Sequence, residues 1–308
     1  MTRAVVFAYH DVGVRCLRVL LEQGVTVPLV VTHLDAPDEP TWFDSVARHA
    51  HWHGLEVACP ADPNTPDFVA RVRAARPDFL FSFYYRQLLG AELLAVAPRG
   101  AFNMHGSLLP SYRGRAPVNW AVLHGEHETG ATLHAMTPRA DAGAIVDAQP
   151  VPILGDDTAA EVMRKVCVAA ELALTRALPS LRDGSAQLRP QQLADGGYFG
   201  RRTSADGAID WRAGAKAVHN LVRAVAPPFP GAFASADGVP LRILRTLPAD
   251  GPRAAQPELR WIDGEVRALC ADGAVRLLEF ELDGQRCDAA AFRARYGTTA
   301  VPLGSGRP

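Results

Sequence analysis

The sequence predicts an α/β protein, in which a Rossmann-like, mostly parallel sheet with helices on both faces precedes a small β-rich domain similar to an OB barrel. Two observations support this prediction. Short apolar runs alternate with stretches of helical periodicity through the first half of the chain, as in parallel sheets with crossover helices. Towards the C-terminus, Asp-Gly pairs lie between alternating strands, which is the pattern of β-hairpins. We therefore predict one domain at residues 1–203 and a second at 204–308.

In the first half, each expected helix ends at a residue that breaks it. Strands are expected at residues 4–9, 25–31, 78–83 and 100–105, and helices at 13–23, 44–53 and 68–75. Gly24 and Gly54 follow the first two helices, at the position where a left-handed residue commonly ends a helix. Pro77 follows the third, and proline cannot continue a helix. The repeated order of strand and helix favours parallel pairing of the strands.

In the second half, the expected elements change from helices to short strands joined by hairpin turns. Strands are expected at residues 131–136 and 144–151, helices at 158–178 and 215–225, and hairpin turns at 237–238 and 272–273. Thr158 and Glu161 have the spacing of a capping box, and Pro179 is expected to end the helix that they begin. The glycine-rich residues 195–202 are expected to form a linker, and the proline-rich residues 227–231 a rigid turn.

Composition and charge exclude several classes of protein. Hydrophobic residues make up 48% and charged residues 21%, and the formal net charge is −1, so no overall field favours a nucleic acid or an anionic membrane. The five cysteines are scattered without CxxC spacing, which argues against a structural zinc or a disulfide framework. The first strand begins at once, without a secretory signal, and no apolar run is long enough to cross a bilayer. We expect a cytoplasmic enzyme with no nucleic-acid partner and no membrane insertion.

Two polar side chains end the apolar strand at residues 100–105. Asn103 and His105 are two residues apart and therefore share a face, and Asp141 lies in a turn between the next two strands. Ligands of open α/β sheets bind beyond the carboxyl ends of the strands, and we expect all three side chains at that rim. An amide can polarise a carbonyl, an imidazole can move a proton, and a carboxylate can orient the imidazole. The alternative is a structural asparagine beside a hydrogen-bonded core histidine.

The motif around these residues is long enough to identify a family. Residues 103–114 contain Asn-x-His-x-Ser-Leu-Leu-Pro-x-x-x-Gly, and Asp141 is followed by Ala-Gly. This pattern resembles the 10-formyltetrahydrofolate-dependent formyltransferases, which include methionyl-tRNA, glycinamide ribonucleotide and sugar-nucleotide enzymes. The resemblance implies an N-formyltransferase that uses 10-formyltetrahydrofolate as co-substrate and no metal.

The resemblance also implies a role for each matching residue. His105 is then the proton-transfer residue, and Asn103 stabilises the transition state. Asp141 favours the protonated form of the His105 imidazole and fixes its ring. The matching formyl-folate positions are Gln87, Leu88, Leu89, Arg115, Thr137, Pro138, Arg139, Ala140 and Asp141.

Two other strand ends carry candidate substrate-binding residues, namely His10 and Asp11 after the first strand and Tyr85 and Arg86 after the third. The alternatives are a helix cap for the first pair and simple packing for the second. The three histidines at 49, 51 and 53 are interpreted as a solvated helix end, because His49 and His53 share a helical face but no third metal ligand is evident.

Within the family, the chain most resembles the formyltransferase domain of the ArnA group, polymyxin-resistance enzymes that formylate UDP-4-amino-4-deoxy-L-arabinose for lipid A modification. The similarity extends to about Phe233 and fades beyond it. Gln87-Leu88-Leu89 replaces the His-Leu-Ile of that group, a conservative change if the backbone makes the contacts. That group also carries a decarboxylating dehydrogenase domain, for which this length leaves no room, so a separate polypeptide is expected to supply that activity.

Two other functions remain open at this point. Methionyl-tRNA formyltransferase is the alternative enzyme, although such enzymes usually have a small residue at the position of Arg115 and lack the Tyr-Tyr-Arg that ends at Arg86. A non-catalytic folate- or nucleotide-binding module is the alternative from a different class. The presence of Asn103, His105 and Asp141 argues against such a module. Formyl-folate and a UDP-amino sugar are the expected substrates.

Overall fold

Two compact units make up the chain in the computed structural model, which describes residues 1–35, 41–252 and 254–306. Unit 1 contains residues 1–117, 128–151 and 163–200, and unit 2 contains residues 118–127, 152–162 and 201–308. Within the described ranges, no helix combines the length and the apolar character needed to cross a membrane.

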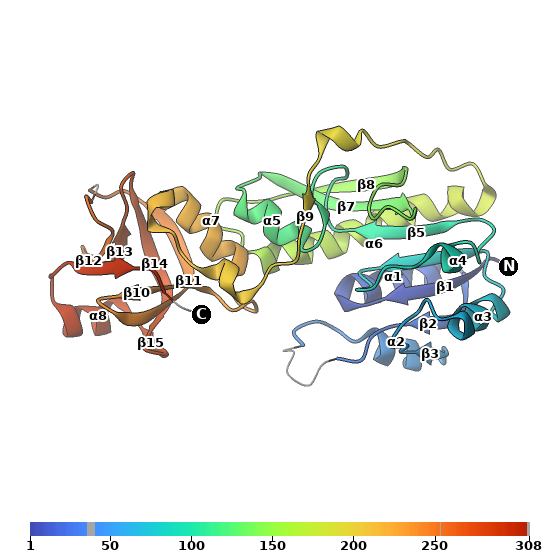
Figure 1. Ribbon diagram of the computed structural model, residues 1–308, viewed down its shortest axis with the longest axis horizontal. Helices are drawn as coiled ribbons and strands as arrows, with labels where there is room; N and C mark the ends of the chain where they lie inside the picture. The colour runs from blue at the N-terminus through green and yellow to red at the C-terminus, as the bar shows by residue number, and fades with distance from the viewer. Residues whose placement is uncertain (36–40, 253, 307–308) are drawn as a thin grey trace. The chain divides into compact units, whose positions relative to one another are not determined.

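Unit 1 is built on a seven-stranded sheet in the order β3-β2-β1-β4-β5-β7-β8 (Figure 1). Its strands are β1 (Arg3–Ala8), β2 (Thr26–Val31), β3 (Val57–Ala58), β4 (Phe79–Phe83), β5 (Ala101–His105), β7 (Glu128–Ala135) and β8 (Ile145–Pro152). The pairs β1–β2, β2–β3, β1–β4 and β4–β5 are parallel, whereas β5 and β7 are antiparallel. The predicted Rossmann-like, mostly parallel sheet is confirmed.

Helices cover both faces of this sheet. They are α1 (His10–Glu22), α2 (Val46–Trp52), α3 (Pro66–Ala74), α4 (Ala91–Leu94) and α6 (Ala159–Asp183), of which the first turn belongs to unit 2. On one face, α3 and α4 share a hydrophobic cluster with Val5 and Phe7 of β1. The alternate residues of β1, including Val6, are equally buried and therefore face the opposite layer. In that layer α1 and α6 are joined by a hydrogen bond from Arg15 Nε to Glu171 Oε2 at 2.6 Å.

The expected end of α6 at Pro179 is wrong, because the helix continues through this proline to Asp183. A proline lacks the N–H that would bond the carbonyl four residues earlier, here that of Thr175. Gln23 Nε2 donates to the Thr175 carbonyl at 3.1 Å and so replaces the missing partner. Sequence alone does not show this contact, since it comes from the end of α1.

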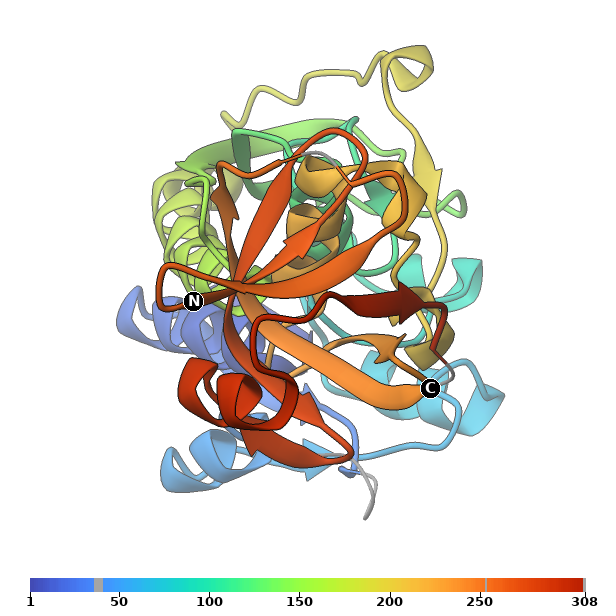
Figure 2. The same ribbon diagram turned by 90° about the vertical axis from the view of Figure 1, so that its left-hand side faces the viewer.

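Unit 2 contains a closed antiparallel barrel, whose strands are drawn in orange to dark red in Figure 2. The barrel strands are β10 (Ala232–Ala236), β11 (Val239–Ala249), β12 (Glu258–Ile262), β13 (Glu265–Leu269), β14 (Ala274–Leu282) and β16 (Val301–Gly304), with β15 (Gln285–Cys287) added beside β14. The sheet order is β11-β10-β16-β12-β13-β14, and pairing of β14 with β11 closes it. This six-stranded barrel confirms the predicted β-rich C-terminal domain.

Helices and turns complete unit 2. Its helices are α5 (Pro117–Leu123), α7 (Ala215–Val225) and α8 (Ala289–Tyr296). The predicted hairpins are present: Asp237-Gly238 joins β10 to β11, and Asp272-Gly273 lies in the loop between β13 and β14. A third hairpin at Asp263-Gly264 joins β12 to β13 and was missed in the sequence, although both residues have the positive φ of a tight hairpin turn.

Candidate active site

The candidate site lies on one face of the sheet, over β5 and β7. Asn103 and His105 are two residues apart on β5, and the antiparallel register places His134 opposite Asn103 and Thr132 opposite His105. All four side chains therefore line the same face. His134 was missed by the sequence analysis, because its relation to Asn103 depends on the pairing of β5 with β7 rather than on any local motif.

Asp141 reaches this face through a turn that folds back, and not because the strand before it ends at the carboxyl rim, as expected. Because β7 runs antiparallel to β5, the end of β7 lies beside the start of β5 and not at the carboxyl rim. The turn after β7 folds back over the sheet, so that Asp141 Oδ1 lies 3.6 Å from His105 Nδ1 and 3.6 Å from His134 Nε2. The three predicted residues do come together, but around a fourth, His134.

The hydrogen bonds around this group define which nitrogen of each ring carries a proton. His134 Nδ1 lies 2.9 Å from the carbonyl oxygen of Ala135, which can only accept, so Nδ1 donates and Nε2 accepts from Asn103 Nδ2 at 3.1 Å. His105 Nε2 likewise donates to the carbonyl of Tyr112 at 2.8 Å. The basic nitrogen of a neutral His105 is therefore Nδ1, which faces Asp141.

Burial and charge have opposite effects on the two ionisable partners. Burial lowers the pKa of His105 below its ordinary value, and the opposing influence of the Asp141 carboxylate and the Tyr112 carbonyl does not cancel it. Burial alone would raise the pKa of Asp141, but His105, His134 and the Gly114 N–H outweigh it and hold that pKa well below the ordinary range. At neutral pH the pair is a neutral imidazole beside a carboxylate.

Two loops hold this pair in place. The loop after β5 is fixed by Thr132, whose hydroxyl donates to Ser107 O at 2.6 Å and accepts from Leu109 N at 3.1 Å. Farther along, the Gly114 N–H donates to Asp141 Oδ2 at 2.9 Å, which joins this loop to the turn after β7. Asp141 has a φ of +53°, a left-handed conformation that aspartate tolerates better than most residues.

Apart from Arg115, the predicted folate-contact residues lie in two stretches that share one hydrophobic cluster. Leu89 and Met136, the residue just before Thr137, both pack in the cluster beneath α3 and α4. Asn64 fixes the first stretch by donating to Leu88 O at 3.0 Å and accepting from Gly90 N at 2.6 Å. Gln87, Leu88, Arg115 and Thr137 through Ala140 are partly or fully exposed, whereas Asp141 belongs to the histidine network.

The predicted substrate-binding residues meet in an aromatic cluster after β1, β2 and β4. Tyr85 stacks on His33 with ring centroids 4.1 Å apart, and the Arg86 guanidinium lies 4.4 Å from the centroid of the Tyr9 ring. His10 contacts Phe43 with centroids 4.4 Å apart. We name Tyr9, His10, His33, Trp42, Phe43, Tyr85 and Arg86 the aromatic cluster. His33, Trp42 and Phe43 were not predicted, since nothing in the sequence relates them to the other strand ends.

Asp11 makes a contact within the fold. Its Oδ1 accepts the backbone N–H of Asp44 at 2.8 Å, so the carboxylate holds the segment that leads into α2. The helix-cap alternative for His10 and Asp11 is wrong, because Tyr9 is the N-cap of α1 and no side chain makes a cap hydrogen bond there; both residues lie in the first turn of the helix.

Comparison with known families matches both parts of the chain. The formyl transferase model matches residues 22–178, and the model of the formyl transferase C-terminal domain matches residues 202–297. The chain belongs to the formyl transferase family. The catalytic side chains predicted from the sequence lie in the part that the first of these models covers.

Solved structures with the same fold include several sugar N-formyltransferases. An N-formyltransferase from Helicobacter canadensis, in complex with folinic acid and dTDP-3-aminofucose, is 18% identical, with a TM-score of 0.72 over 93% of this chain and 100% of its own. WlaRD, a sugar 3N-formyltransferase, is 19% identical, with a TM-score of 0.70 over 90% and 97% of the two chains. A sugar N-formyltransferase from Shewanella sp. FDAARGOS_354 is 20% identical, with a TM-score of 0.61 over 82% and 100%.

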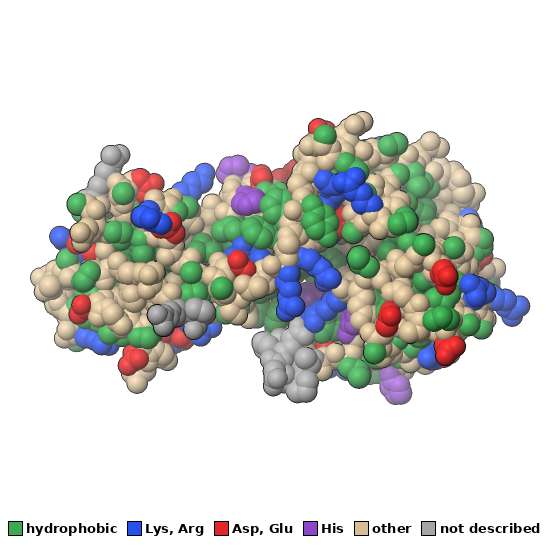
Figure 3. Space-filling model, in the orientation of Figure 1, with side chains coloured by type: hydrophobic (Ala, Val, Ile, Leu, Met, Phe, Trp, Pro, Cys, Tyr) green, Lys and Arg blue, Asp and Glu red, His purple; other side chains and the backbone are tan. Residues whose placement is uncertain are grey.

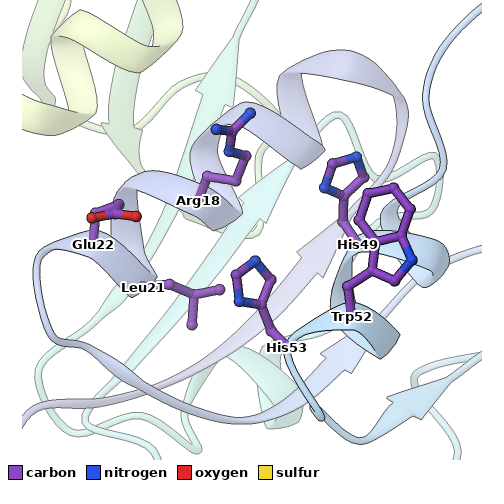
Figure 4. A pocket seen from close by; sticks show the side chains of 6 residues that line it. All are labelled: Arg18, Leu21, Glu22, His49, Trp52 and His53. Atoms are coloured by element: carbon purple, nitrogen blue, oxygen red, sulfur yellow. The ribbon is translucent and has the colours of Figure 1, made fainter.

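His49 of α2 and His53, the residue after this helix, line a surface hollow of about 310 Å³ on this formyltransferase (Figure 4). His49 and His53 face α1 together with Trp52, but His49 Nε2 is occupied by Asp44 Oδ2 at 2.6 Å. Among the residues that the structure describes, no group of three or more His, Cys, Asp or Glu side chains could hold a metal ion.

Gly143 of the formyltransferase is predicted to tolerate no side chain. A Cβ at this position would lie 1.8 Å from the carbonyl oxygen of Ala135, which is the backbone of β7 and cannot move aside. We expect Gly143→Ala to lower the free energy of unfolding by about 1–3 kcal/mol, as overpacking does, and to reduce activity by displacing Asp141. Urea unfolding checks this, with Gly155→Ala as the control because a Cβ there meets nothing within 4 Å. Equal unfolding free energies for the two variants would contradict it.

Proposed function

We propose that this formyltransferase transfers the formyl group of 10-formyltetrahydrofolate to the amine of a nucleotide-linked amino sugar. The observation that carries the proposal is the convergence of Asn103, His105 and Asp141, from β5 and the turn after β7, on one face of the sheet. These groups supply a hydrogen-bond donor, a proton carrier and a fixed negative charge, which formyl transfer to an amine requires.

His105 acts as the proton carrier. Because burial keeps its imidazole neutral at neutral pH, Nδ1 can accept a proton from the attacking amine. The imidazolium then has both N–H groups satisfied, one at the Tyr112 carbonyl and one toward the Asp141 carboxylate. When the amide bond has formed, the same proton passes to the departing folate nitrogen, and the neutral imidazole is regenerated.

Asn103 stabilises the negative charge that develops on the formyl oxygen. One N–H of its Nδ2 is held by His134, which fixes the plane of the amide. The other N–H is then oriented without a loss of side-chain freedom during the reaction, as electrostatic catalysis requires. His134 is a positioning residue in this scheme, because it acts through Asn103.

The residues that would hold the formyl-folate fit a planar co-substrate. The backbone of residues 87–90 is fixed by Asn64, and the Leu88 side chain, 69% exposed, lies open beside it. The second stretch, residues 137–141, ends at the catalytic carboxylate. When bound, 10-formyltetrahydrofolate supplies the activated one-carbon group. Arg115, which is exposed, provides positive charge for its carboxylates.

The aromatic cluster is the proposed contact surface for the acceptor. Aromatic faces and the Arg86 guanidinium suit the base and phosphates of a nucleotide sugar. The H. canadensis and WlaRD structures support this class of acceptor, because they are sugar N-formyltransferases of the same fold.

UDP-4-amino-4-deoxy-L-arabinose is the proposed first acceptor, in the cytoplasmic route to lipid A modification and polymyxin resistance. In that route a separate decarboxylase polypeptide would supply the amino sugar's precursor. The methionyl-tRNA alternative is less well supported, because on the visible face of unit 2 acidic and basic side chains are interspersed (Figure 3). Ion pairs such as Arg242–Glu281 and Arg276–Glu265 neutralise part of the basic charge of unit 2.

The test is formyl transfer from 10-formyltetrahydrofolate to a panel of amines. The panel contains UDP-4-amino-4-deoxy-L-arabinose, dTDP-3-aminofucose, a dTDP-4-amino sugar and methionyl-tRNA, and mass spectrometry detects the gain of one formyl group. We expect transfer to an amino sugar nucleotide and none to the tRNA. Transfer to the tRNA alone would overturn the proposal, and folate binding without any transfer would favour a non-catalytic module.

The pH dependence of the reaction tests the proton-transfer role of His105. Since its pKa is lowered, His105 loses its ability to accept a proton only when the pH falls below the ordinary histidine value of about 6.5. Asp141→Asn removes the charge that raises this pKa, so the acid limb of kcat should move to still lower pH. Rate profiles of both forms on the same amino sugar check the prediction, and a limb that moves to higher pH in the variant would contradict it.

A further inference from the structure

A segment that follows α6 contacts both loops of the candidate site. We name residues 191–199 the strap. In Figure 1 the yellow chain after α6 passes along the top of unit 1 and descends to β9 (Tyr198–Phe199). β9 pairs with β6 (Arg113–Gly114), which corrects the expectation that residues 195–202 are only a linker.

The first end of the strap holds the turn that carries Asp141. Gln191 Nε2 donates to Asp141 O at 3.1 Å and to Gly143 O at 2.6 Å. Gln191 Oε1 is buried and has no hydrogen-bond partner among the described residues. Burial of an amide oxygen without a hydrogen-bond partner costs free energy. The two bonds that Gln191 Nε2 donates to the turn offset this cost and account for the placement of the side chain.

The other end of the strap holds the loop that carries Tyr112 and Gly114. The buried Arg113 side chain donates through one Nη to Leu193 O at 3.0 Å and to Gly196 O at 2.6 Å. The backbone N–H of Arg113 donates to Gly197 O at 3.1 Å, and that of Arg115 to Phe199 O at 2.9 Å.

The backbones at this second contact are closely packed. A Cβ on Gly196 would lie 1.9 Å from Pro110 O, and one on Gly114 would lie 2.3 Å from Phe199 O. The rings of Tyr112 and Phe199 are stacked with centroids 5.0 Å apart. The strap therefore joins the loop on one side of the Asp141–Gly114 hydrogen bond to the turn on the other side.

We propose that the strap fixes the separation of Asp141 from His105, and that Gln191 is the positioning residue through which it acts on Asp141. This inference rests on the proposed function for its catalytic consequence, but not for its effect on His105 itself. The groups that face His105 are Asp141, His134 and the Tyr112 carbonyl, and those that face Asp141 are the two histidines and the Gly114 N–H. Gln191 touches none of the reacting groups.

The variant that tests this is Gln191→Met, which keeps the size of the side chain and removes both donors. Gln192→Met is the matched control, since Gln192 is the adjacent and exposed glutamine. We expect kcat to fall by about tenfold in Gln191→Met, with the KM of both substrates within about twofold of the wild type. A loss of kcat without a change in KM separates positioning from substrate binding.

A second readout does not depend on turnover. As Asp141 moves away, its stabilising effect on the imidazolium weakens, so an NMR titration of His105 should show a lower pKa in Gln191→Met than in Gln192→Met. Equal His105 titrations in the two variants overturn the strap proposal, and a raised KM with unchanged kcat does so as well. If the wild type transfers formyl to no amine while the titrations still differ, the proposed function fails and the strap proposal stands.

Discussion

Replacement of His105 by alanine is expected to reduce kcat by about 10²–10⁴-fold, the usual contribution of general acid–base catalysis. The imidazole is the neutral proton acceptor of the proposed scheme. The other imidazole beside Asp141, that of His134, already accepts a hydrogen bond from Asn103 through Nε2. Single-turnover formyl transfer measures the loss directly, because it separates chemistry from product release.

Two controls make this result interpretable. His105→Gln retains a donor for the Tyr112 carbonyl but carries no titratable proton, so it should be as inactive as the alanine variant while keeping the loop in place. His51→Ala removes an exposed histidine of α2 and should leave activity unchanged. Activity of His105→Gln close to that of the wild type would show that the imidazole serves only as a hydrogen-bond donor.

Substitution of Asn103 is expected to have the second largest effect, a loss of about 10²–10³-fold in kcat, as for removal of one oxyanion donor. Asn103→Ala removes the N–H that we assign to the formyl oxygen, and folate binding should change little because the amide contributes mainly in the transition state. Measurement of kcat and of the folate dissociation constant for the same preparation separates the two effects.

His134 provides the comparison for Asn103. His134→Ala leaves the Asn103 amide present but without the partner that fixes its plane, so we expect a smaller loss than for Asn103→Ala. If His134→Ala is the more damaging of the two, the donor to the formyl oxygen lies on His134, and the assignment of Asn103 must be abandoned.

Much of the fold could be predicted because the signals are local. The alternating apolar runs predicted β1, β2, β4 and β5, and Asp237-Gly238 predicted a hairpin that is present. The placement of Asn103 and His105 on one face follows from their spacing alone. Their meeting with Asp141 did not follow from spacing. Because β7 is antiparallel to β5, the end of β7 lies beside the start of β5, and only the turn after β7 brings Asp141 to His105.

The remaining features depend on contacts between distant segments. The continuation of α6 through Pro179 needs Gln23 from α1, and the role of His134 needs the register of β5 with β7. Residues 195–202 looked like a linker because three of these eight residues are glycine. Gly196, however, is required there by the carbonyl of Pro110. Composition reports flexibility in the unfolded chain, whereas these glycines permit close packing in the folded one.

The pairing of β14 with β11 leaves the barrel without a free edge along its closed circuit. An open sheet offers unpaired N–H and C=O groups that recruit strands from other molecules, which promotes aggregation. In this barrel the appended strand, β15, is only three residues long, too short to template such growth. Other molecules that associate with the barrel circuit must therefore do so through its side chains or loops, rather than by extending its hydrogen-bonded ladder.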